Sequence, residues 1–288
     1  FNRDHLFDIA LFNWKNFIYP EDKIEWIILD DSSIDSIKKL KKKLPRGDSR
    51  IKYYTCKKID KIGKKRNKAN ELASGEIIVH MDDDDYYPPD SIINRVRALL
   101  TYSKQCVGCS SINCINLLDN TCFKTGGGLK DNTIITGEAS LCYYKKFWED
   151  KGYDEDVQGE ECKVFLENRI KDYIDLNSAF VMIAITHSKN MSDRVIKNSI
   201  NRFNFFNDLP VSVVNLLETL QLRIHESLEG MSEAKDFVRQ YYGKPYDEIL
   251  QKIDKLPNYV KSTSLMSSYI EDIQPIENIK DSSVIATY

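Results

Sequence analysis

The sequence predicts an α/β fold built around a mostly parallel β-sheet flanked by helices. Between residues 4 and 105, apolar segments of strand length alternate with amphipathic segments of helix length. Strands separated by roughly ten to fifteen residues of helical pattern are typical of β–α–β units, in which the strands run parallel. In addition, residues 77–79 (Ile-Ile-Val) form an unbroken apolar run, which indicates a central strand buried on both faces.

The individual elements follow from this alternation. In the first part of the chain we expect a helix that ends at Phe17, further helices over 34–44, 64–73 and 90–100, and strands over 24–29, 51–55 and 77–81. From Cys106 the strands become shorter, with a hairpin turn at 119–120, a flexible glycine loop at 126–128, strands at 141–144 and 180–185, and short helices at 145–150 and 162–168. Beyond Pro210 the apolar spacing is helical.

Composition places the chain among ordinary globular proteins. Of its 288 residues, 42% are hydrophobic and 30% are charged, and the net charge of −3 offers no general attraction for nucleic acid. Seven cysteines, an odd number in a chain of this size, favour reduced thiols over a disulfide framework. No apolar stretch approaches the ~20 residues of a membrane helix, and no signal-peptide pattern is present, so we expect a cytoplasmic protein.

A zinc site is the main alternative for the cysteines. Cys106 and Cys109 form a Cys-x-x-Cys pair, and Cys114 and Cys122 follow. In a strand, however, positions three apart point to opposite faces, and no second Cys-x-x-Cys pair follows. The zinc interpretation is therefore the weaker one.

Four consecutive aspartates, Asp82 to Asp85, directly follow the buried strand. Neighbouring carboxylates repel each other by about 1 kcal/mol per close pair in water, and by more once they are desolvated. The carboxyl end of a parallel strand is also where open α/β sheets bind ligands. In an extended segment Asp82 and Asp84 would share one face, and Asp83 and Asp85 the other. The run predicts a site for Mg²⁺, Mn²⁺ or Ca²⁺, of which the first two commonly share their coordination with phosphate oxygens.

Two other interpretations of the aspartate run remain. Charge runs usually face water, so a solvated acidic turn is the first alternative. The second is an EF-hand, which requires glycine at the sixth position and glutamate at the twelfth. Counting from Asp82, those positions hold Tyr87 and Ile93, so the EF-hand fits poorly.

Several motifs, in their order along the chain, resemble family 2 glycosyltransferases of the GT-A fold, which move a sugar from a nucleotide diphosphate to an acceptor. Residues 1–3 resemble the family's Tyr-Asn-Arg, which follows an opening strand that has no counterpart before Phe1. Residues 26–35 are similar to an apolar strand that ends in Asp-Asp-Gly-Ser-x-Asp, and residues 63–76 to a segment with Gly-x-x-x-Arg-Asn. Residues 82–90 match Asp-x-Asp-Asp-x-Tyr-x-Pro-Asp position for position.

The later motifs continue the resemblance. Residues 152–155 (Gly-Tyr-Asp-Glu) are similar to the family's Gly-Phe-Asp-Glu, and residues 158–161 (Gln-Gly-Glu-Glu) stand where the family has Gly-Glu-Asp. Residues 187–192 resemble its His-x-x-Asn-x-Ser loop. The resemblance implies a catalytic domain over 1–195, with a nucleotide-binding half (1–105) and an acceptor-binding half (106–195), and a helical extension over 196–288. That extension offers a surface for a homo-oligomer.

For the donor, the resemblance implies that Asp31, or as second choice Asp30, accepts a hydrogen bond from the base. A carboxylate at a strand end can accept the imide N–H of uracil. The alternative is that Asp31 or Ser32 only caps the next helix. The other residues expected at the donor are Arg66, near the nucleotide and diphosphate at a helix N-terminus that favours anions, with Asp82, Asp83 and Arg194.

For the metal, the resemblance implies Asp84 as the principal ligand, with Asp82 in support, His187 as a further ligand, and Asp85 in a structural role. Imidazole beside carboxylates is compatible with Mn²⁺, and Mg²⁺ is the alternative. Glu161 or Glu160 is the expected catalytic base. His5, His80 and His225 have no comparable sequence context.

The implied reaction is a metal-dependent, inverting transfer from a nucleotide sugar. UDP is the expected nucleotide, with dTDP and GDP as alternatives, and the acceptor is a glycan, protein or lipid hydroxyl. The aromatic residues Tyr143, Tyr144 and Trp148 could stack on an acceptor sugar, although such residues more often belong to the core. Two other functions stay open: a two-metal nucleotidyl or phosphoryl transferase, with ions ~4 Å apart, and a non-catalytic or incomplete glycosyltransferase-like module that binds nucleotide or glycan without turnover.

Overall fold

A computed structural model of the chain describes residues 4, 6–116, 122–125, 128–130, 133–156, 161–187, 196–200 and 284–287. The α-helices in these ranges are α1 (Phe7–Asn16), α2 (Ile34–Lys43), α3 (Ile62–Leu72), α4 (Ser91–Tyr102), α5 (Lys145–Asp150) and α6 (Glu161–Leu166). The strands are β1 (Ile24–Asp30), β2 (Ile51–Thr55), β3 (Ile77–His80), β4 (Cys106–Gly108), β5 (Asn113–Asn116), β6 (Cys122–Thr125), β7 (Gly128–Lys130), β8 (Thr133–Ile135), β9 (Cys142–Tyr144), β10 (Tyr173–Asp175), β11 (Ile183–Thr186), β12 (Ile196–Ile200) and β13 (Val284–Thr287).

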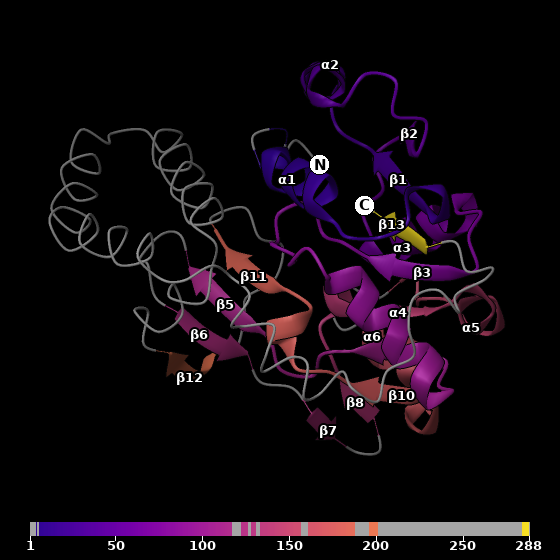
Figure 1. Ribbon diagram of the computed structural model, residues 1–288, viewed down its shortest axis with the longest axis vertical. Helices are drawn as coiled ribbons and strands as arrows, with labels where there is room; N and C mark the ends of the chain where they lie inside the picture. The colour runs from indigo at the N-terminus through magenta and orange to yellow at the C-terminus, as the bar shows by residue number, and fades with distance from the viewer. Residues whose placement is uncertain are drawn as a thin grey trace, which may run out of the picture.

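A seven-stranded sheet in the order β10-β4-β9-β3-β13-β1-β2 forms the centre of the fold (Figure 1). Strands β3, β13, β1 and β2 are parallel neighbours. Strand β9 runs antiparallel between β3 and β4, and β10 is parallel to β4. Beside this sheet lie a four-stranded sheet, β11-β5-β6-β12, and the hairpin β7-β8. The arrangement confirms the predicted α/β fold with a mostly parallel central sheet.

The two faces of the central sheet are covered by different helices, because side chains alternate along each strand. On one face, Trp26 of β1 stacks on Phe7 of α1 with 5.6 Å between ring centroids, and Val96 of α4 belongs to the same core. On the other face, Ile27 packs in a second core with Phe165 of α6. The sheet therefore lies between two layers of helices, and the carboxyl ends of its middle strands emerge between these layers.

The predicted elements of the first part of the chain are confirmed, with ends shifted by one or two residues at most. Two later expectations need correction. The predicted strand at 180–185 starts as a 3₁₀ turn, and β11 begins only at Ile183. The predicted glycine loop at 126–128 is wrong at Gly128, which opens β7; the other two glycines and the turn at 119–120 lie outside the described residues.

The expected helical extension over 196–288 is described only at two short segments, and both are strands. β12 pairs antiparallel with β6, and β13 lies in the middle of the central sheet. Residues 201–283 lie outside the described residues. Strand β13 lies between β1 and β3, so the central sheet is continuous at this point.

Candidate functional site

The carboxyl ends of β1 and β3 meet at a small cavity of ≈ 60 Å³. Asp30 and Ser32 line it from the end of β1, Asp82 and Asp83 line it after β3, and Lys65 lines it from α3. Only β13 separates the two strands. The fold thus brings together the two acidic segments that the sequence analysis singled out.

The two aspartates at the end of β1 have protein partners. Asp30 accepts hydrogen bonds from the Tyr53 hydroxyl at 2.5 Å and from the backbone N–H of Ser32 at 2.9 Å. Asp31 is buried and accepts from Lys65 Nζ at 2.5 Å and from the backbone N–H of Ile59 at 3.0 Å. Burial alone would raise the pKa of Asp31, but the hydrogen bond and charge of Lys65 lower it below its usual value.

These contacts decide between two interpretations of the β1 end. Helix α2 has Ser33 as its N-cap residue, and no side chain caps it through a hydrogen bond. The alternative that Asp31 or Ser32 serves as its cap is therefore wrong. Asp31 is instead fixed from two sides, by Lys65 Nζ and by the backbone N–H of Ile59.

The aspartates after β3 form a compact cluster. One carboxylate oxygen from each of Asp82, Asp84 and Asp85 lies within 4.8 Å of the others. His187, which follows β11, places its Nε2 at 2.9 Å from Asp84 Oδ2, and both side chains are buried. Asp84 and Asp85 are 5% and 1% exposed, so the alternative of a solvated acidic turn is wrong.

The composition of this cluster differs from the prediction in one respect. Alternation along an extended segment would have paired Asp82 with Asp84 and kept Asp85 on the other face. Strand β3 ends at His80 and the chain turns at Asp83 and Asp84, so the alternation does not continue. Asp85 therefore joins the cluster, where its Oδ1 also accepts a hydrogen bond from the backbone N–H of Ile185 at 2.8 Å.

The donor set fits a hard divalent cation. Carboxylate oxygens are the ligands that Mg²⁺ and Mn²⁺ prefer, and Mn²⁺ also accepts an imidazole nitrogen such as that of His187. Within the described ranges this is the single group of three or more metal-ligating side chains, and none of the seven cysteines forms a disulfide.

Arg66 lies beside the cluster and is itself part of a buried network. Its NH1 is 3.5 Å from Asp82 Oδ1 and 2.8 Å from His80 Nδ1. On the other side of the imidazole, His80 Nε2 is 2.6 Å from the Tyr143 hydroxyl and 3.2 Å from that of Tyr153. Helix α3 begins at Ile62, before Gly63, so Arg66 lies past the first turn rather than at the helix N-terminus that was expected.

Two of the sequence motifs hold each other in place. The side-chain amide of Asn67 donates to the Tyr153 carbonyl at 2.9 Å and accepts from the Tyr153 N–H at 2.9 Å. A Cβ on Gly152 would come within 3.0 Å of Asn67 Oδ1, so only glycine fits there without displacement. The Arg-Asn pair of α3 and the Gly-Tyr-Asp-Glu segment therefore form one clamp, and Tyr143 and Tyr153 belong to the core rather than to an acceptor surface.

The remaining predicted residues are described only in part. Glu161 is the first residue of α6, but its side chain, Glu160 and Arg194 lie outside the described residues. Asp83 lines the cavity shared with β1. The roles of these residues stay predictions.

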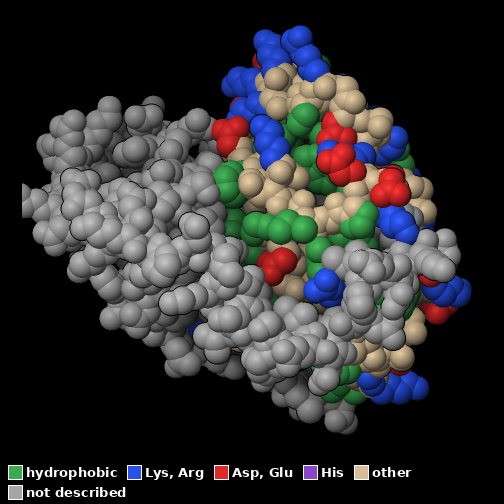
Figure 2. Space-filling model, in the orientation of Figure 1, with side chains coloured by type: hydrophobic (Ala, Val, Ile, Leu, Met, Phe, Trp, Pro, Cys, Tyr) green, Lys and Arg blue, Asp and Glu red, His purple; other side chains and the backbone are tan. Residues whose placement is uncertain are grey.

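Sequence reasoning missed Lys65 and His80. Lys65 stands in a run of basic residues, and its neighbours Lys64 and Lys68 are exposed. Nothing in the sequence distinguishes the one lysine that α3 directs at Asp31. Other exposed lysines gather on α2, seen as blue side chains at the top of Figure 2.

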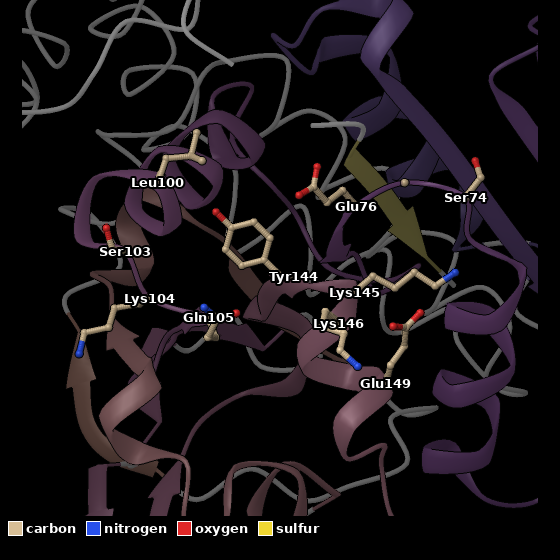
Figure 3. Close-up of a pocket in the computed structure, with 11 residues that line it drawn as sticks. Ser74, Glu76, Leu100, Ser103, Lys104, Gln105, Tyr144, Lys145, Lys146 and Glu149 are labelled. Carbon is tan, nitrogen blue, oxygen red and sulfur yellow. The ribbon is translucent and has the colours of Figure 1, made fainter. Parts of the chain in front are cut away.

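A larger hollow of ≈ 780 Å³ lies at the opposite edge of the sheet, before β3 and β4 begin. Figure 3 shows its lysines and glutamates spread along the rim rather than gathered at one point. Two of these lysines donate to backbone carbonyls, Lys104 to Lys171 and Lys145 to Ala73. The side chains that could bind a ligand are therefore concentrated at the carboxyl edge of the sheet, at the smaller cavity.

The described helices include none that is both long and apolar enough to cross a lipid bilayer.

Comparison with known proteins gives a consistent assignment. Residues 2–121 match the family described as Glycosyl transferase family 2.

Two individual proteins are similar to this chain. A GalNAc(5)-diNAcBac-PP-undecaprenol beta-1,3-glucosyltransferase of Campylobacter jejuni is 26% identical over 213 residues, which cover 69% of this chain and 67% of that protein. The crystal structure of S. aureus TarS 1-349 in complex with UDP-GlcNAc superposes with a TM-score of 0.51 at 16% identity, over 81% of this chain and 68% of the other. The similarity to TarS shows a similar fold and nothing beyond it.

Proposed function

We propose that this chain, whose residues 2–121 match the glycosyl transferase family 2 model, is a metal-dependent, inverting glycosyltransferase that uses a UDP-sugar. One observation carries the proposal: the buried Asp82-Asp84-Asp85 cluster, with His187 against Asp84, lies at the same sheet edge as Asp30 and Asp31. A nucleotide diphosphate has a base and two phosphates to place, and this edge offers carboxylates for the first and a cation site for the second.

The residues of β1 and α3 bind the donor. Asp31, held by Lys65 and Ile59, accepts the imide N–H of the uracil base. Arg66 contributes a fixed positive charge for the diphosphate, because a guanidinium stays protonated and donates in a planar fork. Asp82, Asp84 and His187 would hold a divalent cation, which would supply positive charge against the departing diphosphate. Mn²⁺ is the favoured ion because of the imidazole.

Glu161 is the proposed general base. It accepts the proton of an acceptor hydroxyl, and that oxygen then attacks the anomeric carbon from the side opposite the leaving diphosphate, which inverts the configuration. Glu161 stands in the acidic segment 158–161, which resembles the family's Gly-Glu-Asp, and this resemblance supports the role. The similar protein from C. jejuni suggests a glycan hydroxyl as the acceptor class.

The first experiment is calorimetric titration of UDP, dTDP and GDP into the full chain, with and without Mn²⁺. We expect UDP to bind and Mn²⁺ to strengthen its binding at least tenfold. A screen of UDP-sugars for UDP release then tests turnover, and proton NMR of the released or transferred sugar reports the anomeric configuration.

Two matched variants test the base. Glu161→Gln is expected to lower UDP release by about 100-fold or more, as removal of a general base does, while Glu160→Gln has a smaller effect. UDP binding without release in the wild type would instead support a non-catalytic module. Release of free pyrophosphate, with UDP-sugar formation, would support a nucleotidyl transferase and sink the proposal.

A further inference from the structure

His80 has hydrogen-bond partners on both nitrogens of a fully buried imidazole. Arg66 NH1 lies 2.8 Å from Nδ1, and the Tyr143 hydroxyl lies 2.6 Å from Nε2. A guanidinium has only donors, so Nδ1 must be the unprotonated nitrogen and must accept. The proton is then on Nε2, which donates to Tyr143, and the neutral tautomer is fixed by its surroundings.

The same guanidinium that His80 holds faces the acidic cluster. Arg66 NH1 is 3.5 Å from Asp82 Oδ1, and the Arg66 side chain is only 5% exposed. An arginine side chain has many rotamers, and fixing one of them costs conformational entropy. A buried acceptor that is already in place selects one orientation before any ligand arrives.

We propose that His80 is a positioning residue, which holds the Arg66 guanidinium toward Asp82 in the orientation that receives the donor diphosphate. This inference rests on the proposed function, in which Arg66 contacts the donor. His80 itself lies under the sheet edge and touches no substrate. Its contribution is the lone pair on Nδ1.

A purely structural role for His80 is the competing explanation, and the surrounding contacts weaken it. Helix α3 is tied to the sheet and the adjoining loop without His80. Asn70 donates to the Tyr143 hydroxyl at 2.9 Å, and Asn67 makes two hydrogen bonds with the backbone of Tyr153. The imidazole adds one thing that these do not, an acceptor for Arg66.

Two isosteric substitutions separate the two nitrogens. In His80→Asn, the amide oxygen can take the place of Nδ1 and accept from Arg66. In His80→Gln, the amide nitrogen can take the place of Nε2 and donate to Tyr143, but the Nδ1 acceptor is lost. We expect His80→Gln to lower kcat/KM for the UDP-sugar by about tenfold, the scale of one charge-assisted hydrogen bond, and His80→Asn to stay within about threefold of the wild type.

A double-mutant cycle with Arg66→Lys makes the test specific. If His80 acts through Arg66, His80→Gln adds little to the loss already caused by Arg66→Lys, because contacting residues are non-additive. Additive losses, or equal losses in His80→Gln and His80→Asn, would overturn the inference. Thermal unfolding of each variant identifies a loss that comes from the fold. If the wild type neither binds UDP nor releases it from a UDP-sugar, the proposed function fails, whereas an active wild type with a fully active His80→Gln refutes only the positioning role.

Discussion

The carboxylates at the ends of β1 and β3 lie at one cavity but are neutralised in different ways. At the β1 end the protein supplies the partners itself, with Lys65 on Asp31 and the Tyr53 hydroxyl on Asp30. At the β3 end three carboxylates approach within 4.8 Å of one another. Their nearest described arginine contact, Arg66 to Asp82, is 3.5 Å long and lies at one side. The first set of acids is organised by folding, and the second has a set of oxygen ligands that could hold a divalent cation.

The largest expected effect comes from the β3 end. Asp84→Asn keeps the shape of a buried side chain but removes the charge that binds the metal, so we expect metal-dependent UDP release to fall by about 100-fold or more. The measurement is UDP release across a Mn²⁺ titration. Asp150→Asn, at an exposed pair with Lys146, is the control and should match the wild type. Undiminished activity in Asp84→Asn would remove the distinction between the two strand ends.

The next effect tests the β1 end. Lys65→Met leaves Asp31 buried without its cation, and breaking such a pair costs about 3 kcal/mol of the free energy of unfolding. Urea denaturation measures the loss, and Lys68→Met, at the exposed Lys68–Glu71 pair, should leave the free energy of unfolding nearly unchanged.

The stability difference between the wild type and Lys65→Met should depend on pH, and the direction of that dependence can be derived. Folding lowers the pKa of Asp31 in the wild type, so its contribution to stability is complete above the usual aspartate pKa and is lost as the pH falls through the folded value. The stability difference between the wild type and Lys65→Met should therefore shrink below about pH 4. A difference that is constant with pH would show that Lys65 stabilises the fold by packing alone.

The smallest effect concerns a carboxylate neutralised by the protein away from the ligand edge. The hydrogen bond from Arg50 lowers the pKa of Asp48 to about 2. Because the Arg50 side chain is 30% exposed, solvent screens the pair, and we expect Asp48→Asn to cost about 1 kcal/mol at pH 7. The loss of stability in Asp48→Asn should vanish as the pH approaches 2. Thermal unfolding without added denaturant, measured between pH 7 and pH 2, can follow it.

Sequence reasoning was strongest where one physical rule acts locally. Periodicity predicted the helices and strands up to Tyr102 because their apolar residues recur at helical or strand spacing. It failed at Asp85, because the turn after His80 interrupts the alternation, and at β13, because no local pattern says where a strand pairs.

The candidate site shows the same limit. The aspartate run and His187 could be singled out from their motifs, and the fold places them in contact. Lys65 and His80 could not, since each acts on a partner far away in the sequence. His80 stands in a strand whose pattern indicated only burial, and its partners come from α3 and β9.

The central position of β13 also has a practical consequence for handling the protein. Strand β13 runs parallel to β1 and β3, so Thr287 leads out of the sheet at the edge where the cavity lies. An affinity tag or a fluorescent fusion attached behind it would emerge beside the proposed sugar-nucleotide pocket. Purification handles are better inserted elsewhere, or cleaved before ligand titrations begin.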